Sequence, residues 1–176
     1  MNKNYFKFLK LVLKNNSLLR ALQIYECLNI DLQGNSLEFG ATSNRDKTFS
    51  NFVKGKSKFH YSNKISNKKM DIFYSDLTKK LKIPTKKYNN ILLFNVLEHL
   101  PEYKFAFLEI YKILKKKGSL IGSTPFIYQI HAAPKDYFRF SKQFFELNLK
   151  KYKFKKVKVK SLGFGPFTAS YSLLCP

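Results

Sequence analysis

Cysteine and tryptophan are almost missing from this chain of 176 residues, which has two cysteines and no tryptophan. Cys27 and Cys175 lie far apart in the sequence, and neither has a histidine at the spacing of a zinc ligand. The pattern indicates neither a disulfide framework nor a cysteine-based zinc site, so we expect no metal. A reducing, cytoplasmic compartment fits this composition best.

Long apolar runs are missing as well. No segment reaches the roughly 20 apolar residues that cross a bilayer. Residues 6–14 are apolar but interrupted by lysines, which predicts neither a signal peptide nor an anchor. Two alternatives stay open for this segment: a cationic amphipathic helix with peripheral membrane contact, or a helix that packs its apolar face onto the domain that follows.

Acidic residues are scarce, with 11 Asp and Glu against 33 Lys and Arg, and the formal net charge is +22. Arginine occurs only at Arg20, Arg45 and Arg139, although nucleic-acid recognition depends heavily on the planar guanidinium group. No basic cluster belongs to a known nucleic-acid-binding module, so nucleic acid is not the expected partner. A basic protein acting at anionic surfaces is an alternative that only the charge supports.

The length sets the domain organisation, because 176 residues can bury one core but are too few for two ordinary domains. We expect a helical segment, residues 1–35, packed on a main domain of residues 36–165. Ser17 is the expected N-cap of a helix in the first segment. Residues 166–176 form an apolar tail, which predicts a truncated gene product and self-association through the tail.

Residues 91–124 hold a strand, a helix and a second strand. Residues 91–94 are a continuous apolar run, as in a parallel strand covered on both faces. Pro101 predicts the start of a helix, and residues 120–124 predict the next strand. Right-handed crossover in such a unit places residues 95–99 at the carboxyl edge of the sheet, where open α/β folds bind ligands.

The helix in this unit has a clear apolar face and a predicted end. Three lysines at 115–117 suit the negative end of a helix dipole, and Gly118 is a good left-handed cap. The apolar face has the i, i+3, i+4, i+7 spacing and consists of Phe107, Ile110, Tyr111 and Leu114. Further strands are predicted at residues 36–39, 58–62, 71–74 and 156–160. The last of these alternates strictly between valine and lysine, which is typical of an edge strand.

Three motifs in this order carry a family resemblance: NVLEHLP at 95–101, ILKKKG at 113–118 and TPF at 124–126. They resemble the second half of a class I S-adenosylmethionine-dependent methyltransferase of the type 11 group. HAAPKDYFRFS at 131–141 resembles the segment after the fifth strand in a bacterial subgroup. The resemblance implies an α/β, Rossmann-like, mostly parallel sheet with helices on both faces. Only six strands are expected here, because too little chain remains for the usual seventh.

The resemblance assigns cofactor-binding positions in the first half of the domain. Glu38 and Gly40 match the acid and the glycine-rich turn after the first strand, Ala41 follows them, and Thr42 stands where a second glycine is usual. Asn63 aligns with an acid that binds the ribose hydroxyls. Because an amide lacks the charge of a carboxylate, Asn63→Asp would tighten cofactor binding by about 1 kcal/mol if the side chain faces the ribose.

Two more residues match cofactor-binding positions, and His99 is a candidate because it follows a strand. Asp76 matches an acid near the adenine, and Asn95 matches a position whose backbone faces the ammonium end of the cofactor. Their structural alternatives are a capped turn for Asp76 and a strand-terminal asparagine for Asn95. His99 could line the cofactor pocket, or it could make a backbone hydrogen bond at the start of the helix.

Chemistry at the acceptor is expected from the segment after the fifth strand. His131 is the candidate general base, with a loop-fixing histidine bonded to a neighbour such as Asp136 as its alternative. Asp136 and Arg139 are three residues apart, which favours an ion pair that shapes the loop. Tyr137 and Arg139 are candidate contacts for an anionic acceptor.

The resemblance implies an enzyme that uses S-adenosyl-L-methionine to methylate a small-molecule, glycan or lipid-linked acceptor. A methyltransferase-like binding module without catalysis is the alternative, favoured by the departures at Thr42 and Asn63.

Overall fold

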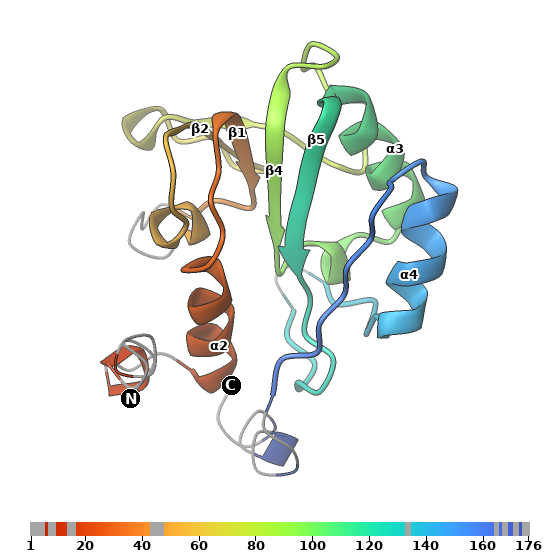
Figure 1. The fold of residues 1–176 in the computed structure, drawn as a ribbon. Helices are drawn as coiled ribbons and strands as arrows, with labels where there is room; N and C mark the ends of the chain where they lie inside the picture. Colours follow the sequence, from red (N-terminus) through yellow and green to blue (C-terminus); the bar gives the residue numbers. More distant parts are fainter. Residues whose placement is uncertain are drawn as a thin grey trace.

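The structure is a computed structural model that describes residues 6, 10–13, 17–42, 48–132, 135–163, 166, 169–170 and 173. Its centre is a sheet of five parallel strands in the order β3-β2-β1-β4-β5 (Figure 1). The strands are β1 (Gly34–Phe39), β2 (Ser57–Asn63), β3 (Ile72–Tyr74), β4 (Tyr88–Phe94) and β5 (Leu114–Ser123). The predicted α/β fold with a parallel sheet is confirmed.

The chain reverses its direction of travel across the sheet at β1. From β1 it moves outward through β2 to β3, and then it returns to the other side of β1 to form β4 and β5. The carboxyl ends of β1 and β4 therefore flank a topological switch point, where loops diverge and leave a crevice. This position is where a ligand site is expected in such a sheet.

Helices flank both faces of the sheet. They are α2 (Leu18–Cys27), α3 (Tyr103–Ile113) and α4 (Lys142–Lys151), and short 3-10 helices lie at η2 (Phe49–Phe52), η3 (Lys68–Met70) and η4 (Leu97–His99). Ile91 and Leu93 point to the face that packs against α3, whereas Phe94 packs against the cluster that includes Ile24 of α2. Because side chains alternate along a strand, β4 contributes to a core on each face.

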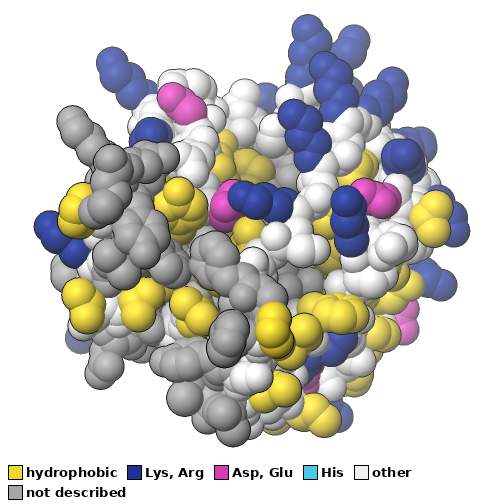
Figure 2. Space-filling view, turned by 60° about the horizontal axis from the view of Figure 1, so that its bottom comes forward, with side chains coloured by type: hydrophobic (Ala, Val, Ile, Leu, Met, Phe, Trp, Pro, Cys, Tyr) yellow, Lys and Arg dark blue, Asp and Glu magenta, His cyan; other side chains and the backbone are white. Residues whose placement is uncertain are grey.

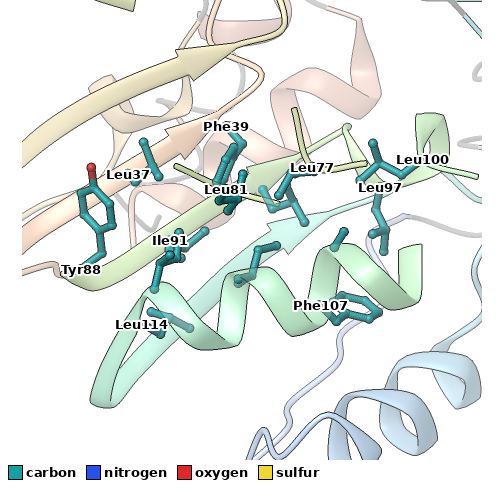
Figure 3. Close-up of a cluster of buried hydrophobic side chains, with 14 of the residues drawn as sticks. Leu37, Phe39, Leu77, Leu81, Tyr88, Ile91, Leu97, Leu100, Phe107 and Leu114 are labelled. Atoms are coloured by element: carbon teal, nitrogen blue, oxygen red, sulfur yellow. The ribbon is translucent and has the colours of Figure 1, made fainter. Parts of the chain in front are cut away.

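The larger core lies between the sheet and α3 (Figure 3). Ala106, Phe107, Ile110 and Ile113 of α3 are buried there, and α4 adds half-buried aromatic side chains around them. The predicted apolar face of this helix is correct at Phe107 and Ile110. The buried face of the helix is nevertheless rotated from the predicted one. Tyr111 is 41% exposed, and Ile113 is buried instead.

The predicted end of this helix at Gly118 is wrong. The helix ends at Ile113, and β5 begins at the next residue. Tyr88 of β4 pairs with Leu114, but Asn90 pairs with Ser119, so residues 115–118 form an irregular excursion in the ladder. Lys117 takes the left-handed conformation at φ 67°, while Gly118 is needed because an added Cβ would lie 2.9 Å from the Asn89 carbonyl oxygen.

The predicted strand at residues 156–160 is also wrong, and no sixth strand exists in the part of the chain that the structure describes. Val157 and Val159 are half-buried and the neighbouring lysines are exposed, so the alternation is real. It reflects an extended segment with one covered side and no strand partner. Phe154 anchors the start of this segment against Phe107 and Tyr111 of α3.

The predicted N-cap of α2 is confirmed, since the Ser17 hydroxyl accepts a hydrogen bond from the Arg20 amide at 3.3 Å. Most of residues 1–16 and 166–176 lie outside the described residues, so the apolar tail and the proposed segment boundaries stay predictions. Among the residues described, we find no helix with both the length and the apolar character needed to cross a membrane.

Candidate active site

The carboxyl end of β4 turns sharply at Asn95, which has a positive φ of 52°. Its backbone N–H donates to the Ser123 carbonyl at the end of β5, which holds the two strand ends together. Its side-chain amide exchanges hydrogen bonds of 2.7 and 3.2 Å with Gln23 of α2. Gln23 is buried and also donates to the Ser123 hydroxyl. Sequence reasoning missed Gln23, because one polar residue in an amphipathic helix gives no signal.

A cleft of about 120 Å³ opens beside this turn, between α2 and the loops that follow β4 and β5. Its lining includes Arg20, Gln23, Asn95, Glu98, Tyr128 and His131. The structure thus brings Asn95 and His131 together, as their predicted roles require. Glu98, which the sequence analysis passed over, belongs to the same cleft.

Glu38 at the end of β1 is buried, and its carboxylate accepts hydrogen bonds from the backbone amides of Phe49 and Ser50 at 2.8 and 2.9 Å. Burial raises the pKa of Glu38, and the two amide hydrogen bonds oppose that shift. Glu38 therefore fixes η2 beside the strand end. In this way it shapes the loop that follows β1.

Gly40 and Ala41 form that loop. Gly40 has a φ of +74°, and a Cβ added there would lie 2.6 Å from the Val96 side chain. The buried Ala41 accepts a hydrogen bond from the Asn63 side-chain nitrogen at 2.8 Å. Asn63 thus braces the loop with one N–H of its amide, and its oxygen and second N–H are left to meet a ribose hydroxyl.

Asp76 lies just beyond β3, and its carboxylate accepts hydrogen bonds from the backbone and hydroxyl of Thr78 at 2.9 and 2.8 Å. Lys64 lies 3.5 Å away. Burial by itself would raise the pKa of Asp76, but these partners outweigh it and lower the pKa. The capped turn expected as the structural alternative is present, and its carboxylate stays ionised beside the strand ends.

Glu98 is the most unusual charged group of the site. Its side chain has no solvent exposure, and neither carboxylate oxygen has a hydrogen-bond partner among the described residues. Burial raises the pKa of Glu98 to about 7 and the nearby Asp136 adds to the rise, while Arg139 and the Glu98 backbone amide, which lies near the carboxylate without the geometry of a hydrogen bond, oppose it. Such a carboxyl group exchanges protons near neutral pH, or pairs with a cation that enters the cleft.

His99 follows Glu98 in η4, and its Nδ1 lies 2.7 Å from the Lys135 carbonyl oxygen. The backbone hydrogen bond expected as its structural alternative is therefore present. The ring also meets the ring of His131 edge to face, with 5.0 Å between centroids. The two histidines lie together, although 32 positions separate them in the sequence.

His131 is held by Asp136, whose Oδ2 accepts the His131 backbone N–H at 3.0 Å and lies 3.3 Å from the ring Nδ1. The ring contact has the distance of an ion pair without the alignment of a hydrogen bond. Arg139 donates two hydrogen bonds of 2.6 and 2.7 Å to the same carboxylate. These bonds hold the pKa of Asp136 well below its usual range. The expected loop-shaping ion pair is confirmed.

Arg139 also donates to the carbonyl oxygens of Tyr128, Gln129 and Phe138. Its guanidinium is therefore committed to the loop, which leaves Tyr137 as the better placed of the two predicted acceptor contacts. Tyr137 is 44% exposed, and its backbone N–H donates to the Glu98 carbonyl oxygen.

A sequence profile of a methyltransferase domain family matches residues 14–122, well over half of the chain. The chain belongs to this methyltransferase domain family. The membership supports the predicted cofactor, S-adenosyl-L-methionine. A search of curated proteins finds no match.

Solved structures share the fold of this methyltransferase domain at low sequence identity. A methyltransferase from Aquifex aeolicus is 15% identical with a TM-score of 0.62, over 93% of this chain and 94% of that one. One from Thermotoga maritima is 18% identical with a TM-score of 0.55, over 87% and 78%. Phosphoethanolamine N-methyltransferase 2 from Haemonchus contortus, solved with S-adenosyl-L-methionine, is 12% identical with a TM-score of 0.60, over 90% and 43%.

Several matched structures are longer than this methyltransferase domain. The chain spans 62% of a structure from a Haloferax volcanii complex, 48% of the YcgJ protein from Bacillus and 43% of the Haemonchus enzyme. At these identities the likeness concerns the fold alone.

The strand ends fit a cofactor that carries hydroxyl, amine and carboxylate groups. The hydroxyls of Ser62 and Ser75, beside Asn63 and Asp76, are buried and have no hydrogen-bond partner among the described residues. Unpaired buried polar groups of this kind are uncommon and are satisfied when a ligand or water binds. The methyltransferase domain therefore has polar groups at the ends of β2 and β3 that can form hydrogen bonds with a bound cofactor.

Proposed function

We propose that this protein transfers a methyl group from S-adenosyl-L-methionine to an acceptor bound in the cleft between α2 and the loops after β4 and β5. The observation that carries the proposal is the meeting of Asn95, Glu98 and His131 beside the switch point of a methyltransferase-family sheet. The predicted cofactor positions Gly40, Asn63 and Asp76 lie at or just after the ends of β1, β2 and β3 along the same edge.

Methyl transfer requires the protein mainly to align the acceptor with the methyl group of the cofactor. The acceptor lone pair attacks the sulfonium methyl group in line, the carbon–sulfur bond breaks, and the sulfur leaves as the neutral thioether of S-adenosylhomocysteine. A hydroxyl acceptor must also lose its proton, and His131 lines the cleft where that proton would be released. The Asp136 carboxylate beside the ring would stabilise the imidazolium that results.

The acceptor class is proposed as a small molecule, a glycan or a lipid-linked compound. Support for an acceptor with an apolar part comes from the loop after β5, where Phe126, Ile127 and Ile130 are 57%, 49% and 86% exposed. In Figure 2, hydrophobic side chains gather in the middle and lower part of the view, and Lys and Arg side chains lie mostly along its upper and right margins, with a few in the middle. This distribution also supports peripheral contact with a lipid surface in the cytoplasm over binding of nucleic acid.

A binding module without catalysis is the second candidate, and the commitment of Asn63 to Ala41 favours it. The two candidates differ in turnover. We expect purified protein to form S-adenosylhomocysteine with at least one member of a panel of amines, phenols, sugars and prenyl-linked compounds. Turnover should fall by about 10²–10⁴ in His131→Ala with little change in cofactor affinity. His60→Gln, in β2, is the matched control. Cofactor binding without turnover on any acceptor would favour the binding module.

A further inference from the structure

Three side chains of the kinds that bind metal ions, from two separate segments, meet beside the cleft, and two of them, Glu98 and His131, line it. Glu98, His99 and His131 each offer one ligand atom, and these atoms lie within 4.8 Å of one another. A cluster of this composition is not by itself a metal site, because histidines and acids also meet for structural reasons.

Glu98 supplies the strongest indication. It is fully buried, it lines the cleft, and both of its oxygens lack hydrogen-bond partners among the described residues. A buried carboxylate without partners is costly, and proteins normally pair such a group with donors, a cation or a metal ion. The nearest basic ring atom is Nε2 of His99, at 3.9 Å from Oε1, which is beyond hydrogen-bond distance.

The surroundings of His99 fix its tautomer. The Lys135 carbonyl oxygen can only accept, so Nδ1 at 2.7 Å must carry the proton. The neutral ring then holds its lone pair on Nε2, the nitrogen that faces Glu98. A backbone carbonyl that orients the opposite ring nitrogen is the usual second partner of a metal-bound histidine.

His131 has a carboxylate beside its ring, although the two groups are not aligned for a hydrogen bond. The Asp136 carboxylate lies 3.3 Å from its Nδ1, and Arg139 and the His131 backbone N–H hold that carboxylate in place. A carboxylate beside a metal-bound histidine orients the ring and raises its basicity.

We propose that Glu98, His99 and His131 bind one divalent transition-metal ion, with Zn²⁺ as the best match. Two imidazoles and one carboxylate favour Zn²⁺ over Mg²⁺ and Ca²⁺, which prefer oxygen ligands alone. Bonds of about 2.1 Å to a tetrahedral ion would bring the ligand atoms to about 3.4 Å from one another, so the side chains must rotate from their present spacing of up to 4.8 Å to close on the ion. Three protein ligands leave one coordination position open toward the cleft.

The consequence for chemistry rests on the function proposed above. An acceptor hydroxyl at the open position would lose its proton more readily, because a bound metal ion lowers the pKa of an oxygen ligand. The metal ion would then perform the activation assigned above to a free His131 ring. Metal binding itself does not depend on the methyl-transfer proposal.

The test uses full-length protein without a polyhistidine tag, freed of metal by EDTA and then titrated with Co²⁺ as a coloured substitute for Zn²⁺. We expect visible ligand-field absorption that saturates at one ion per chain and is displaced by Zn²⁺ but not by Mg²⁺. Zn²⁺ should also raise the melting temperature of the wild-type protein. Glu98→Gln, His99→Ala and His131→Ala should each weaken binding by more than about 100-fold, because even second-shell changes cost 10- to 100-fold.

His60→Gln is the matched control, because His60 is the remaining histidine of the chain and lies in β2. It should bind Co²⁺ like the wild type. Metal-free Glu98→Gln should fold with unchanged or higher thermal stability, since it removes an unpaired buried carboxylate. No saturable binding, or equal loss in His60→Gln, would overturn the proposal. S-adenosyl-L-methionine affinity is measured on the same samples, so failure of the metal site and failure of the proposed function are distinguishable.

Discussion

Two glycines lie at the opposite ends of β1, and both need a positive φ, +77° at Gly34 and +74° at Gly40. Only Gly40 lies at the carboxyl edge, beside the proposed cofactor site. We predict that Gly34→Ala and Gly40→Ala each lower the free energy of unfolding by about 1–3 kcal/mol, because an alanine is strained in this conformation and its Cβ meets a side chain. Urea denaturation measures that cost.

Cofactor affinity separates the two variants. Gly40→Ala should lose measurable S-adenosyl-L-methionine binding, whereas Gly34→Ala should keep the wild-type affinity after its stability loss is allowed for. Equal affinities in the two variants would remove the β1 loop from the cofactor site.

Asn63 gives a prediction that reverses the expectation from sequence. An aspartate there has no donor for the Ala41 carbonyl oxygen and would place a negative charge against it. We therefore predict that Asn63→Asp destabilises the protein by about 1–3 kcal/mol and weakens cofactor binding, in contrast to the gain inferred from charge assistance alone. Calorimetry measures the cofactor affinity of this variant, and urea denaturation measures its stability. Tighter cofactor binding would show that the side-chain oxygen of residue 63, not the nitrogen, determines the affinity.

At the scale of elements, Glu109 joins α3 to the segment before β4. Its buried carboxylate accepts a hydrogen bond from the Leu81 amide at 2.8 Å and one from Lys112 at 2.5 Å. Burial alone would raise its pKa, but the two donors outweigh burial and lower the pKa below 4.5. The unfolded chain then binds the proton more tightly, so this stabilisation is present above about pH 4.5 and is lost as the pH falls.

Glu109→Gln tests this linkage. We predict a loss of about 1–3 kcal/mol at neutral pH, mostly from the Leu81 amide, because Lys112 is half exposed and its contribution is screened. The difference from the wild type should shrink as the pH is lowered. Glu146→Gln, which breaks the exposed pair with Lys142 in α4, is the control and should change stability little. A constant difference at all pH values would contradict the assignment.

Much of the sheet could be predicted from the sequence, because apolar runs such as residues 91–94 mark buried parallel strands whatever lies around them. The wrong predictions concern segments whose sequence pattern can have two different physical causes. The alternation at residues 156–160 reports one covered side, and nothing in it distinguishes a paired strand from a single extended segment. The lysines at 115–117 suit a helix end, but pairing of Leu114 with Tyr88 ends the helix earlier.

The site was predicted less completely than the sheet. Family order located His131 and Asn95 at one edge, and both line the cleft. Gln23 and Glu98 were missed as site residues because their importance arises from burial and from partners distant in sequence, such as the Gln23 contact with Asn95 across 72 positions. Neither the burial of a side chain nor its contacts with distant residues can be read from a single sequence.

For the whole molecule, the net charge of +22 is the dominant electrostatic feature. Like charges on a compact surface repel, and added salt screens them, with a Debye length of about 10 Å at 0.1 M. We predict that the melting temperature rises as NaCl is increased from about 0.01 to 0.15 M at fixed pH. A melting temperature that is unchanged or falls would show that the exposed lysines contribute no net repulsion.

Calorimetric titration of the wild-type protein with S-adenosyl-L-methionine shows whether the carboxyl edge of this sheet binds the cofactor. We predict saturable heat at one ligand per chain, in metal-free and Zn²⁺-loaded protein alike, and loss of that heat in Gly40→Ala but not in Gly34→Ala. An absence of heat and of any thermal shift at about 1 mM cofactor, where even a weak site of about −4 kcal/mol is half filled, would contradict the prediction.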